Sequence, residues 1–168
     1  MSCKNCRINS PVQKMCVRCF VEYFEHKLRQ ETKKVGIERG DSVFLDTQND
    51  RNHHQKIIAF YLQKQFAVKI VRVAAEAQHR ITASSLENEA ENVLRYFFER
   101  EKKIVRNQKV LLTTVTQDDI DRYAELNKIV IGKKQADSEI IGIIKAVHAR
   151  SLNITTGLAN ARQVLKDL

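Results

Sequence analysis

Residues 42–73 read SVFLDTQNDRNHHQKIIAFYLQKQFAVKIVRV, and the pattern in this stretch decides the fold. A short β-branched and aromatic run at 43–45 is followed by a helical stretch at 52–65 and then by a second strand-like run at 68–73. The apolar residues of the helical stretch share one face: Ile57, Ile58, Tyr61 and Leu62. The order strand, helix, strand predicts two parallel strands joined by a crossover helix.

The same alternation continues toward the C-terminus. A helical stretch at 86–105 precedes a strand-like run at 110–115, and a further helix is predicted from Asp118 to about Asn127. The apolar stripe of the longer helix is typical of a core face: Ala90, Val93, Leu94, Phe97 and Phe98. We therefore predict an α/β fold with a Rossmann-like parallel sheet, to which 129–131 could add a fourth strand. Helices are also expected at 138–151 and after Gly157.

Four cysteines precede this region, and they are the only cysteines in the chain. They form two CxxC pairs: Cys3 with Cys6, and Cys16 with Cys19. Two such pairs can bring four thiolates tetrahedrally around one ion, which is the ligand set of a closed structural zinc site. The spacing favours zinc over a redox pair, two disulfides or a chance arrangement, because disulfides are rare in cytosolic proteins and no secretory signal is visible.

An amphipathic helix is predicted directly after the second pair. Phe20, Phe24 and Leu28 recur at a spacing of four, with charged residues between them. Basic residues of this region form a candidate RNA-binding set: Lys14, Arg18, Lys27, Arg29, Lys33 and Lys34. A solvated helix face is the alternative interpretation of these charges. Gly36 and Gly40 then punctuate a linker.

The bulk composition agrees with two units and an anionic partner. The 168 residues suffice for one ordinary domain plus a small metal-held unit, with expected boundaries at 1–34 and 41–168. The formal net charge is +9, which favours a polyanion such as RNA. No stretch approaches the ~20 uncharged apolar residues of a membrane helix. We expect a soluble, cytoplasmic protein that does not bind a membrane.

The order CxxC, then CxxCF, then Tyr23 and the run His26-Lys27-Leu28-Arg29 resembles the amino terminus of the cytoplasmic tRNA 2-thiolation proteins. In these proteins a zinc-binding module and such a helix precede an ATP-pyrophosphatase, or PP-loop, domain. The resemblance lies mainly in residues 1–34, and the stretch 116–124 is weakly similar to a later, carboxylate-containing motif. It implies a PP-loop-like domain and a role in 2-thiolation of the wobble uridine of tRNAs, which two paralogous subunits carry out.

The sequence was also tested for the catalytic features of that family. A PP-loop enzyme needs a glycine-rich turn after its first strand, but no glycine occurs between Gly40 and Gly132. Asp46 and Asp50 would place negative charge where a triphosphate binds. No cysteine follows Cys19, so sulfur transfer would lack a thiol in the main domain. These features predict no catalytic residues and no ATP binding.

Three histidines were also weighed as site residues. His53 and His54 are adjacent on a predicted helix and point about 100° apart, so they cannot jointly face one metal. They could lie in the first turn near a vestigial nucleotide cleft, but we favour the interpretation that they are surface residues. His79 is placed in a loop after the second strand, where it could form an RNA-facing patch with Arg72 and Arg80 or belong to an ordinary solvated loop. Asp118, Asp119 and Asp121 are interpreted as a helix start, where acidic residues are favoured.

The resemblance therefore implies the cytoplasmic tRNA 2-thiolation protein 2 family, the degenerate partner subunit. We expect a non-catalytic chain with one structural zinc, in a heterodimer with a catalytic PP-loop subunit and in contact with tRNA. One alternative is an active PP-loop enzyme with an atypical loop. Another is a zinc-ribbon module for nucleic-acid or protein interaction, unrelated to thiolation.

Overall fold

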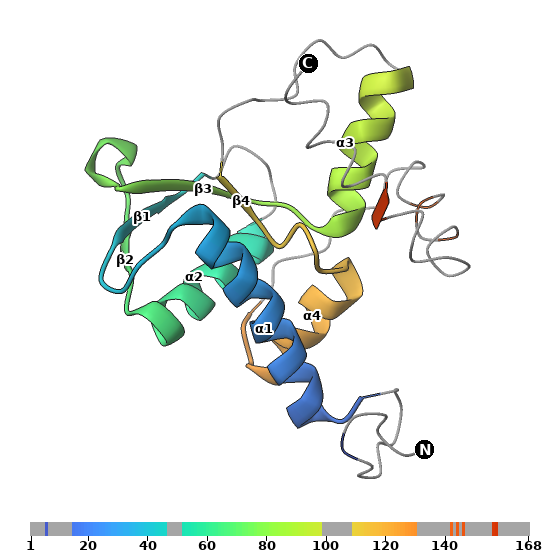
Figure 1. Ribbon diagram of the computed structural model, residues 1–168, viewed down its shortest axis with the longest axis horizontal. Helices are drawn as coiled ribbons and strands as arrows, with labels where there is room; N and C mark the ends of the chain where they lie inside the picture. Colours follow the sequence, from blue (N-terminus) through green and yellow to red (C-terminus); the bar gives the residue numbers. More distant parts are fainter. Residues whose placement is uncertain are drawn as a thin grey trace.

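The computed structural model describes Cys6, residues 15–46, 52–98 and 109–130, and five isolated residues further on: Gly142, Ile144, Ala146, Thr156 and Gly157. The order of its elements is α1 (Val17–Val35), β1 (Ser42–Leu45), α2 (Asn52–Phe66), β2 (Lys69–Val71), a 3-10 turn η1 (Ala74–Glu76), β3 (His79–Ala83), α3 (Leu86–Phe98), β4 (Lys109–Leu111) and α4 (Gln117–Leu126) (Figure 1). No helix in the described ranges is long and apolar enough to cross a bilayer.

The four strands form one parallel sheet in the order β2-β1-β3-β4. Because every strand runs in the same direction, the carboxyl ends of β1, β3 and β4 meet at one edge, and α2, α3 and α4 begin there. The strand order reverses beside β1, since β2 lies on one side of it and β3 on the other. This confirms the predicted Rossmann-like α/β fold, in which ligands bind outside the carboxyl ends at such a switch point.

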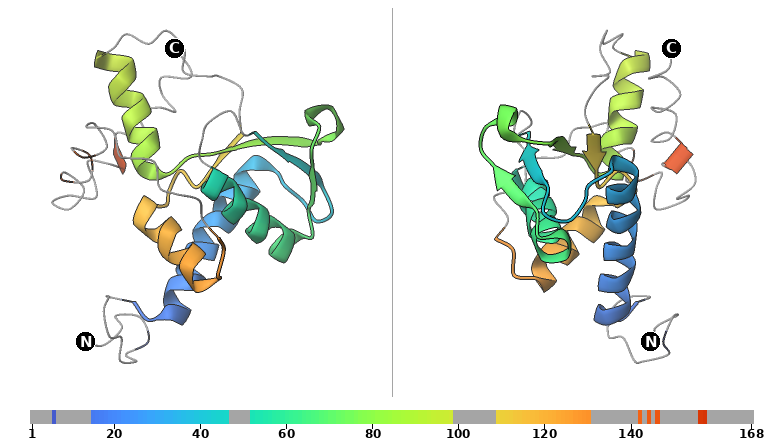
Figure 2. Two further views of the ribbon diagram at one scale, coloured as in Figure 1. Left: turned by 180° about the vertical axis from the view of Figure 1, so that it is seen from behind. Right: turned by 60° about the vertical axis from the view of Figure 1, so that its left-hand side comes forward.

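One face of the sheet carries the hydrophobic core. Val43, Ile81 and Leu111 are fully buried on this face, against apolar side chains of α1, α2 and α4. On the other face Phe44 is half-buried, and Arg80 is exposed with its guanidinium 5.6 Å from the centre of the Phe44 ring. Among the helices, α3 extends away from the other three (Figures 1 and 2).

Helix α1 belongs to this core because its apolar stripe recurs at the helical period. Phe24 and Leu28 are fully buried, and the Phe24 ring stacks on Tyr123 of α4 with centroids 4.1 Å apart. The helix ends at Gly36, which has a φ of 75° and donates its N–H to Lys33 O, while Ile37 N–H bonds Thr32 O. This is the glycine C-cap expected of a left-handed terminal residue. The predicted boundary between 1–34 and 41–168 stays a prediction.

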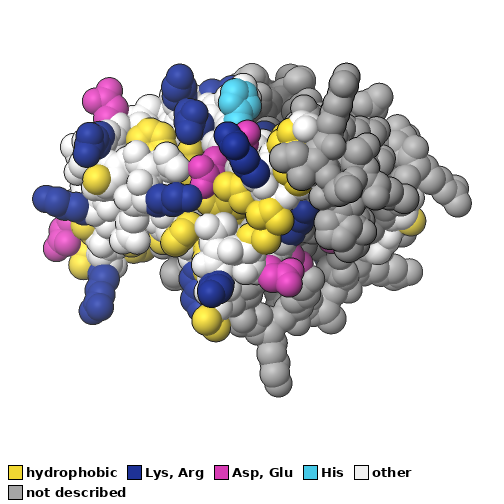
Figure 3. Space-filling view, turned by 90° about the horizontal axis from the view of Figure 1, so that it is seen from below, with side chains coloured by type: hydrophobic (Ala, Val, Ile, Leu, Met, Phe, Trp, Pro, Cys, Tyr) yellow, Lys and Arg dark blue, Asp and Glu magenta, His cyan; other side chains and the backbone are white. Residues whose placement is uncertain are grey.

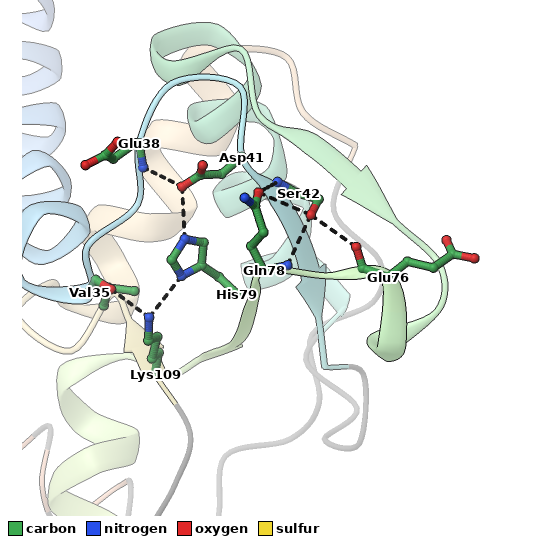
Figure 4. A network of polar contacts seen from close by, with 8 residues as sticks. All are labelled: Val35, Glu38, Asp41, Ser42, Glu76, Gln78, His79 and Lys109. Carbon is green, nitrogen blue, oxygen red and sulfur yellow. Dashed lines mark hydrogen bonds and ion pairs between the residues drawn. The ribbon is translucent and has the colours of Figure 1, made fainter.

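The amino ends of the strands are joined by a polar network (Figure 4). Asp41 Oδ2 accepts the Glu38 N–H at 2.7 Å and lies 2.9 Å from His79 Nε2, and Lys109 Nζ is 2.9 Å from His79 Nδ1. Ser42 and Gln78 exchange further hydrogen bonds. This network fixes the unusually short connection 72–78 between β2 and β3, where parallel strands normally need a dozen residues or more.

Two sequence-based assignments differ from the structure. His79, expected in a loop, is the first residue of β3, a strand that the sequence pattern did not reveal. Its run HRITA holds one large apolar residue, Ile81, and it becomes a strand because β1 and β4 pair with it on both sides. In the candidate fourth strand, Ile129 and Val130 are not in a strand, and position 131 lies outside the described residues.

Candidate functional site

The carboxyl edge of the sheet gathers buried polar side chains from the segments that follow β1 and β3. Asp46 follows β1, Ser84 and Ser85 follow β3, and His54 lies in the first turn of α2. All four are at least nine-tenths buried, although polar residues of these types are usually exposed. The interpretation of His54 as a surface residue was therefore wrong, because the first turn of α2 faces the neighbouring helix starts rather than solvent.

Gln117, the first residue of α4, connects the helix starts. Its side-chain Oε1 lies 2.7 Å from His54 Nε2, and its Nε2 donates to Asp121 Oδ1 at 2.9 Å. Its backbone N–H donates to Glu87 Oε2 on α3, also at 2.9 Å. One residue thus fixes side chains from α2, α3 and α4 relative to one another.

The two serines after β3 differ in their hydrogen bonding. Ser85 Oγ accepts the Asn88 N–H at 3.3 Å and caps the start of α3. Ser84 is 5% exposed, and its hydroxyl has no hydrogen-bond partner among the residues that the structure describes. Since buried hydroxyls are normally hydrogen-bonded, Ser84 is a group at this edge that a ligand would satisfy.

The charge at the edge is partly compensated. Asp46 Oδ2 lies 3.3 Å from the Arg80 guanidinium, and the backbone of Asp46 bonds to Ile81 O and to the Gln55 side chain. Burial raises the pKa of the Asp119 carboxyl above its usual value, although Thr116 caps the same turn and opposes that shift. The N-termini of three helices also point their positive dipole ends toward this edge, which favours bound anions.

The second candidate site is the cysteine cluster before α1. The sulfurs of Cys6, Cys16 and Cys19 lie within 4.8 Å of one another, with 3.4 Å between Cys6 Sγ and Cys16 Sγ. Thiolates at such distances fit a single soft metal ion. Cys3, the fourth predicted ligand, lies outside the described residues. The structure thus brings together three of the four predicted ligands: Cys6, Cys16 and Cys19.

The predicted RNA-binding residues fall into two groups. Arg18, Arg29 and Lys33 lie on one exposed face of α1, and Lys34 is exposed elsewhere on its last turn. Lys27 instead faces the protein and donates to Thr114 O at 2.7 Å. Lys14 lies outside the described residues. Arg18 is paired with Glu22 at 3.0 Å, but both side chains are exposed, so this pair contributes little to stability.

Across the described surface, exposed basic residues outnumber exposed acidic ones. Figure 3 shows Lys and Arg side chains spread over the described part of one face, with few Asp or Glu among them. The exposed basic residues are Arg18, Arg29, Lys33, Lys34, Arg39, Lys56, Lys64, Lys69, Arg72, Arg80, Lys109 and Lys128. The exposed acidic residues are Glu22, Glu38, Glu76, Asp118 and Glu125.

No protein-family model and no curated protein matches this sequence. The fold, however, is similar to the solved structure of the U34-tRNA thiolase NcsA from Methanococcus maripaludis with its [4Fe-4S] cluster. The TM-score is 0.78 at 12% sequence identity, and the match covers 99% of this chain and 88% of that chain. A likeness at this identity shows a shared fold.

This comparison contradicts two expectations drawn from the sequence. A non-catalytic subunit was expected, with a structural zinc and without ATP, whereas the matching structure is a thiolase that carries a [4Fe-4S] cluster. The expectation relied on missing glycines and on the charge of Asp46. In the structure Asp46 is paired with Arg80, and polar groups of the edge also come from the segments after β3 and β4.

Proposed function

We propose that this protein acts in the 2-thiolation of the wobble uridine of tRNA, as an enzyme with its reaction centre at the carboxyl edge of the sheet. The observation that carries the proposal is the fold likeness to a U34-tRNA thiolase over 99% of the chain. The buried polar groups at the switch point of the sheet support it, because this is where α/β folds bind their ligands.

The reaction places clear demands on such an edge. ATP would adenylate the uridine O2 with release of pyrophosphate, a sulfide-level donor would form the new bond to C2, and AMP would leave with the oxygen, without net oxidation. The helix N-termini suit the phosphates, and the Ser84 hydroxyl can donate to a ligand oxygen. Arg80 offsets the charge of Asp46, which would otherwise repel the nucleotide.

In this proposal tRNA binds along the exposed face of α1. Arg18, Arg29 and Lys33 are exposed on this face, together with Glu22, and Lys14 and Lys34 are further basic residues of the predicted set. Replacing Arg18, Arg29 and Lys33 by Gln should weaken tRNA binding and lower the slope of log affinity against log salt by ~1 per lost phosphate contact. A control variant with Gln at Lys56, Lys69 and Lys128 removes the same charge elsewhere. An equal loss of tRNA affinity in both variants would contradict a specific role of α1 in tRNA binding.

The cysteines would hold a metal at the start of α1. Cys3, Cys6, Cys16 and Cys19 are the proposed ligands, and the gathered sulfurs of the last three support this. A Cys16→Ser variant should lose bound metal, measured by elemental analysis for iron and zinc, and should unfold more easily because the metal ties the N-terminal segment to α1. Full metal content in this variant would exclude Cys16 as a ligand.

The direct test of the function is reconstitution. Purified protein is incubated with ATP, sulfide and a tRNA transcript carrying U34, and 2-thiouridine is measured by mass spectrometry of the digested tRNA. Product that depends on both ATP and U34 is expected. A second PP-loop chain is proposed as a heterodimer partner, so the assay is run with and without proteins that co-purify with this chain. Absence of product under both conditions would refute the proposed function.

A further inference from the structure

A buried carboxylate of α1 holds the loop that leads into the candidate site. Glu31 is 5% exposed, and its carboxylate accepts three hydrogen bonds: from Leu112 N–H at 2.6 Å, from Thr113 Oγ1 at 2.9 Å and from Thr114 N–H at 2.8 Å. Charge-assisted bonds of this kind are about twice as strong as neutral ones. Burial of this charge is therefore compensated entirely within one short loop.

The loop 112–114 contains an unfavourable backbone conformation, which the hydrogen bonds to Glu31 can maintain. Leu112 has a φ of 75°, a left-handed conformation that is uncommon for a residue with a branched side chain. Lys27, one turn before Glu31 on α1, adds a bond to Thr114 O at 2.7 Å. Strained residues persist only where their surroundings determine them, so α1 determines the path of this loop.

The same loop continues directly into Gln117. Leu86 N–H of α3 bonds to Val115 O, Thr116 caps α4, and Gln117 follows as the residue that contacts His54, Asp121 and Glu87. A change in the path of 112–114 would therefore displace Gln117, and with it the ring of His54.

We infer that Glu31 is a positioning residue for the carboxyl-edge site: through the β4–α4 loop it sets the location of Gln117 and the orientation of His54. The inference rests on the proposed function only where it refers to thiolation, since the geometric coupling can be measured without any activity. Glu31 also connects α1, which follows the cysteine cluster, to the carboxyl end of the sheet, opposite the network in Figure 4.

The test compares two Glu→Gln variants on the same helix. Glu31→Gln leaves one oxygen to accept hydrogen bonds and places an amide where the loop donates its N–H groups. Glu25→Gln is the matched control, because Glu25 also joins α1 to the core, through Tyr123, Lys64 and Gln65, but does not contact residues 112–114. Both variants are measured for unfolding midpoint, for the NMR resonances of the Gln117 amide and the His54 ring, and for thiolation of tRNA.

Glu31→Gln is expected to move the His54 and Gln117 resonances and to lower kcat for thiolation by about 10-fold, with little change in KM for tRNA. Glu25→Gln should leave these resonances and kcat near those of the wild-type protein, even at equal loss of stability. Thr113→Val removes one bond to Glu31 and should produce smaller shifts in the same direction, which keeps the test valid if Glu31→Gln does not fold.

Equal resonance shifts in the Glu25 and Glu31 variants would overturn the inference, as would an unchanged His54 ring in both Glu31→Gln and Thr113→Val. If the resonances move as expected but the wild-type protein makes no 2-thiouridine, the positioning role stands and the proposed function fails. The two claims are thus tested separately.

Discussion

The two ends of the same parallel strands carry polar clusters of different kinds. At the amino end Asp41, His79 and Lys109 form a chain of short contacts, and Ser42 bonds with Gln78 (Figure 4). At the carboxyl end the polar groups are more deeply buried, and the Ser84 hydroxyl has no hydrogen-bond partner within the described part of the chain. The amino-end cluster is held by hydrogen bonds within the protein, whereas the carboxyl-end cluster contains the Ser84 hydroxyl, which has no such bond among the described residues.

This difference distinguishes polar groups that stabilise the fold from polar groups that are available to a ligand. A buried polar group costs free energy unless it is hydrogen-bonded, so a fully bonded cluster is accounted for by the stability of the fold. The stability of the fold does not account for a buried hydroxyl without a hydrogen-bond partner at the switch point of the sheet, and a ligand is the natural partner for it. Substitutions at the amino end should therefore lower the free energy of unfolding and leave the thiolation activity unchanged. Substitution of Ser84 should lower the activity and leave the free energy of unfolding unchanged.

The largest expected effect on stability is that of Asp41→Ala. This change removes the acceptor for Glu38 N–H and for His79, and should lower the free energy of unfolding by about 2 kcal/mol. Denaturant unfolding measures the loss, and thiolation at a temperature where the variant is folded should be unchanged. A specific loss of activity would contradict a structural role for the amino-end network.

Ser85→Ala should have the next largest effect. Ser85 caps α3 through the Asn88 N–H, and loss of such a cap costs about 1 kcal/mol. The free energy of unfolding is compared with that of Ser84→Ala, its neighbour in the chain. Equal destabilisation by the two changes would mean that Ser84 also has a structural bond.

A smaller effect concerns acid stability. The Glu38 N–H bond, and after it the bond and charge of His79 and the charge of Lys109, hold the pKa of Asp41 below its usual value. Asp41 therefore contributes stability above its unfolded pKa of about 3.9, and this contribution is lost as the pH falls through the lower folded value. The difference in unfolding midpoint between wild type and Asp41→Asn should be large near pH 5 and shrink as the pH falls below about 4. A constant difference down to pH 2 would show that Asp41 is not stabilised in its charged form.

Much of the fold could be predicted from the sequence, because local periodicity marks its helices. The stretch 42–73 indicated β1, α2 and β2 within a residue or two, and the spacing of the cysteines predicted that their sulfurs converge. Strand β3 could not be predicted, because the run HRITA holds only one large apolar residue and has no clear strand pattern. Its pairing with β1 and β4 on both sides makes it a strand.

The candidate site was harder to predict because its contacts join residues distant in sequence. Glu31 bonds to a loop more than 80 residues away, and His54 meets Gln117 from another helix. The buried serine pair after β3 has no local signal, since the sequence does not show which serine caps a helix. The missing glycines were visible, but they concern only the stretch after β1, whereas Ser84 and Gln117 follow β3 and β4.

The most direct test of the account is the amount of 2-thiouridine that Ser84→Ala forms at U34, relative to the wild-type protein. No protein hydrogen bond of Ser84 Oγ is lost among the described residues, so the free energy of unfolding should stay within about 0.5 kcal/mol. We predict that this stable variant forms about 10-fold less product or lower, as expected when a donor to the reacting ligand is removed. Wild-type yield from Ser84→Ala would contradict the assignment of the carboxyl edge as the reaction centre.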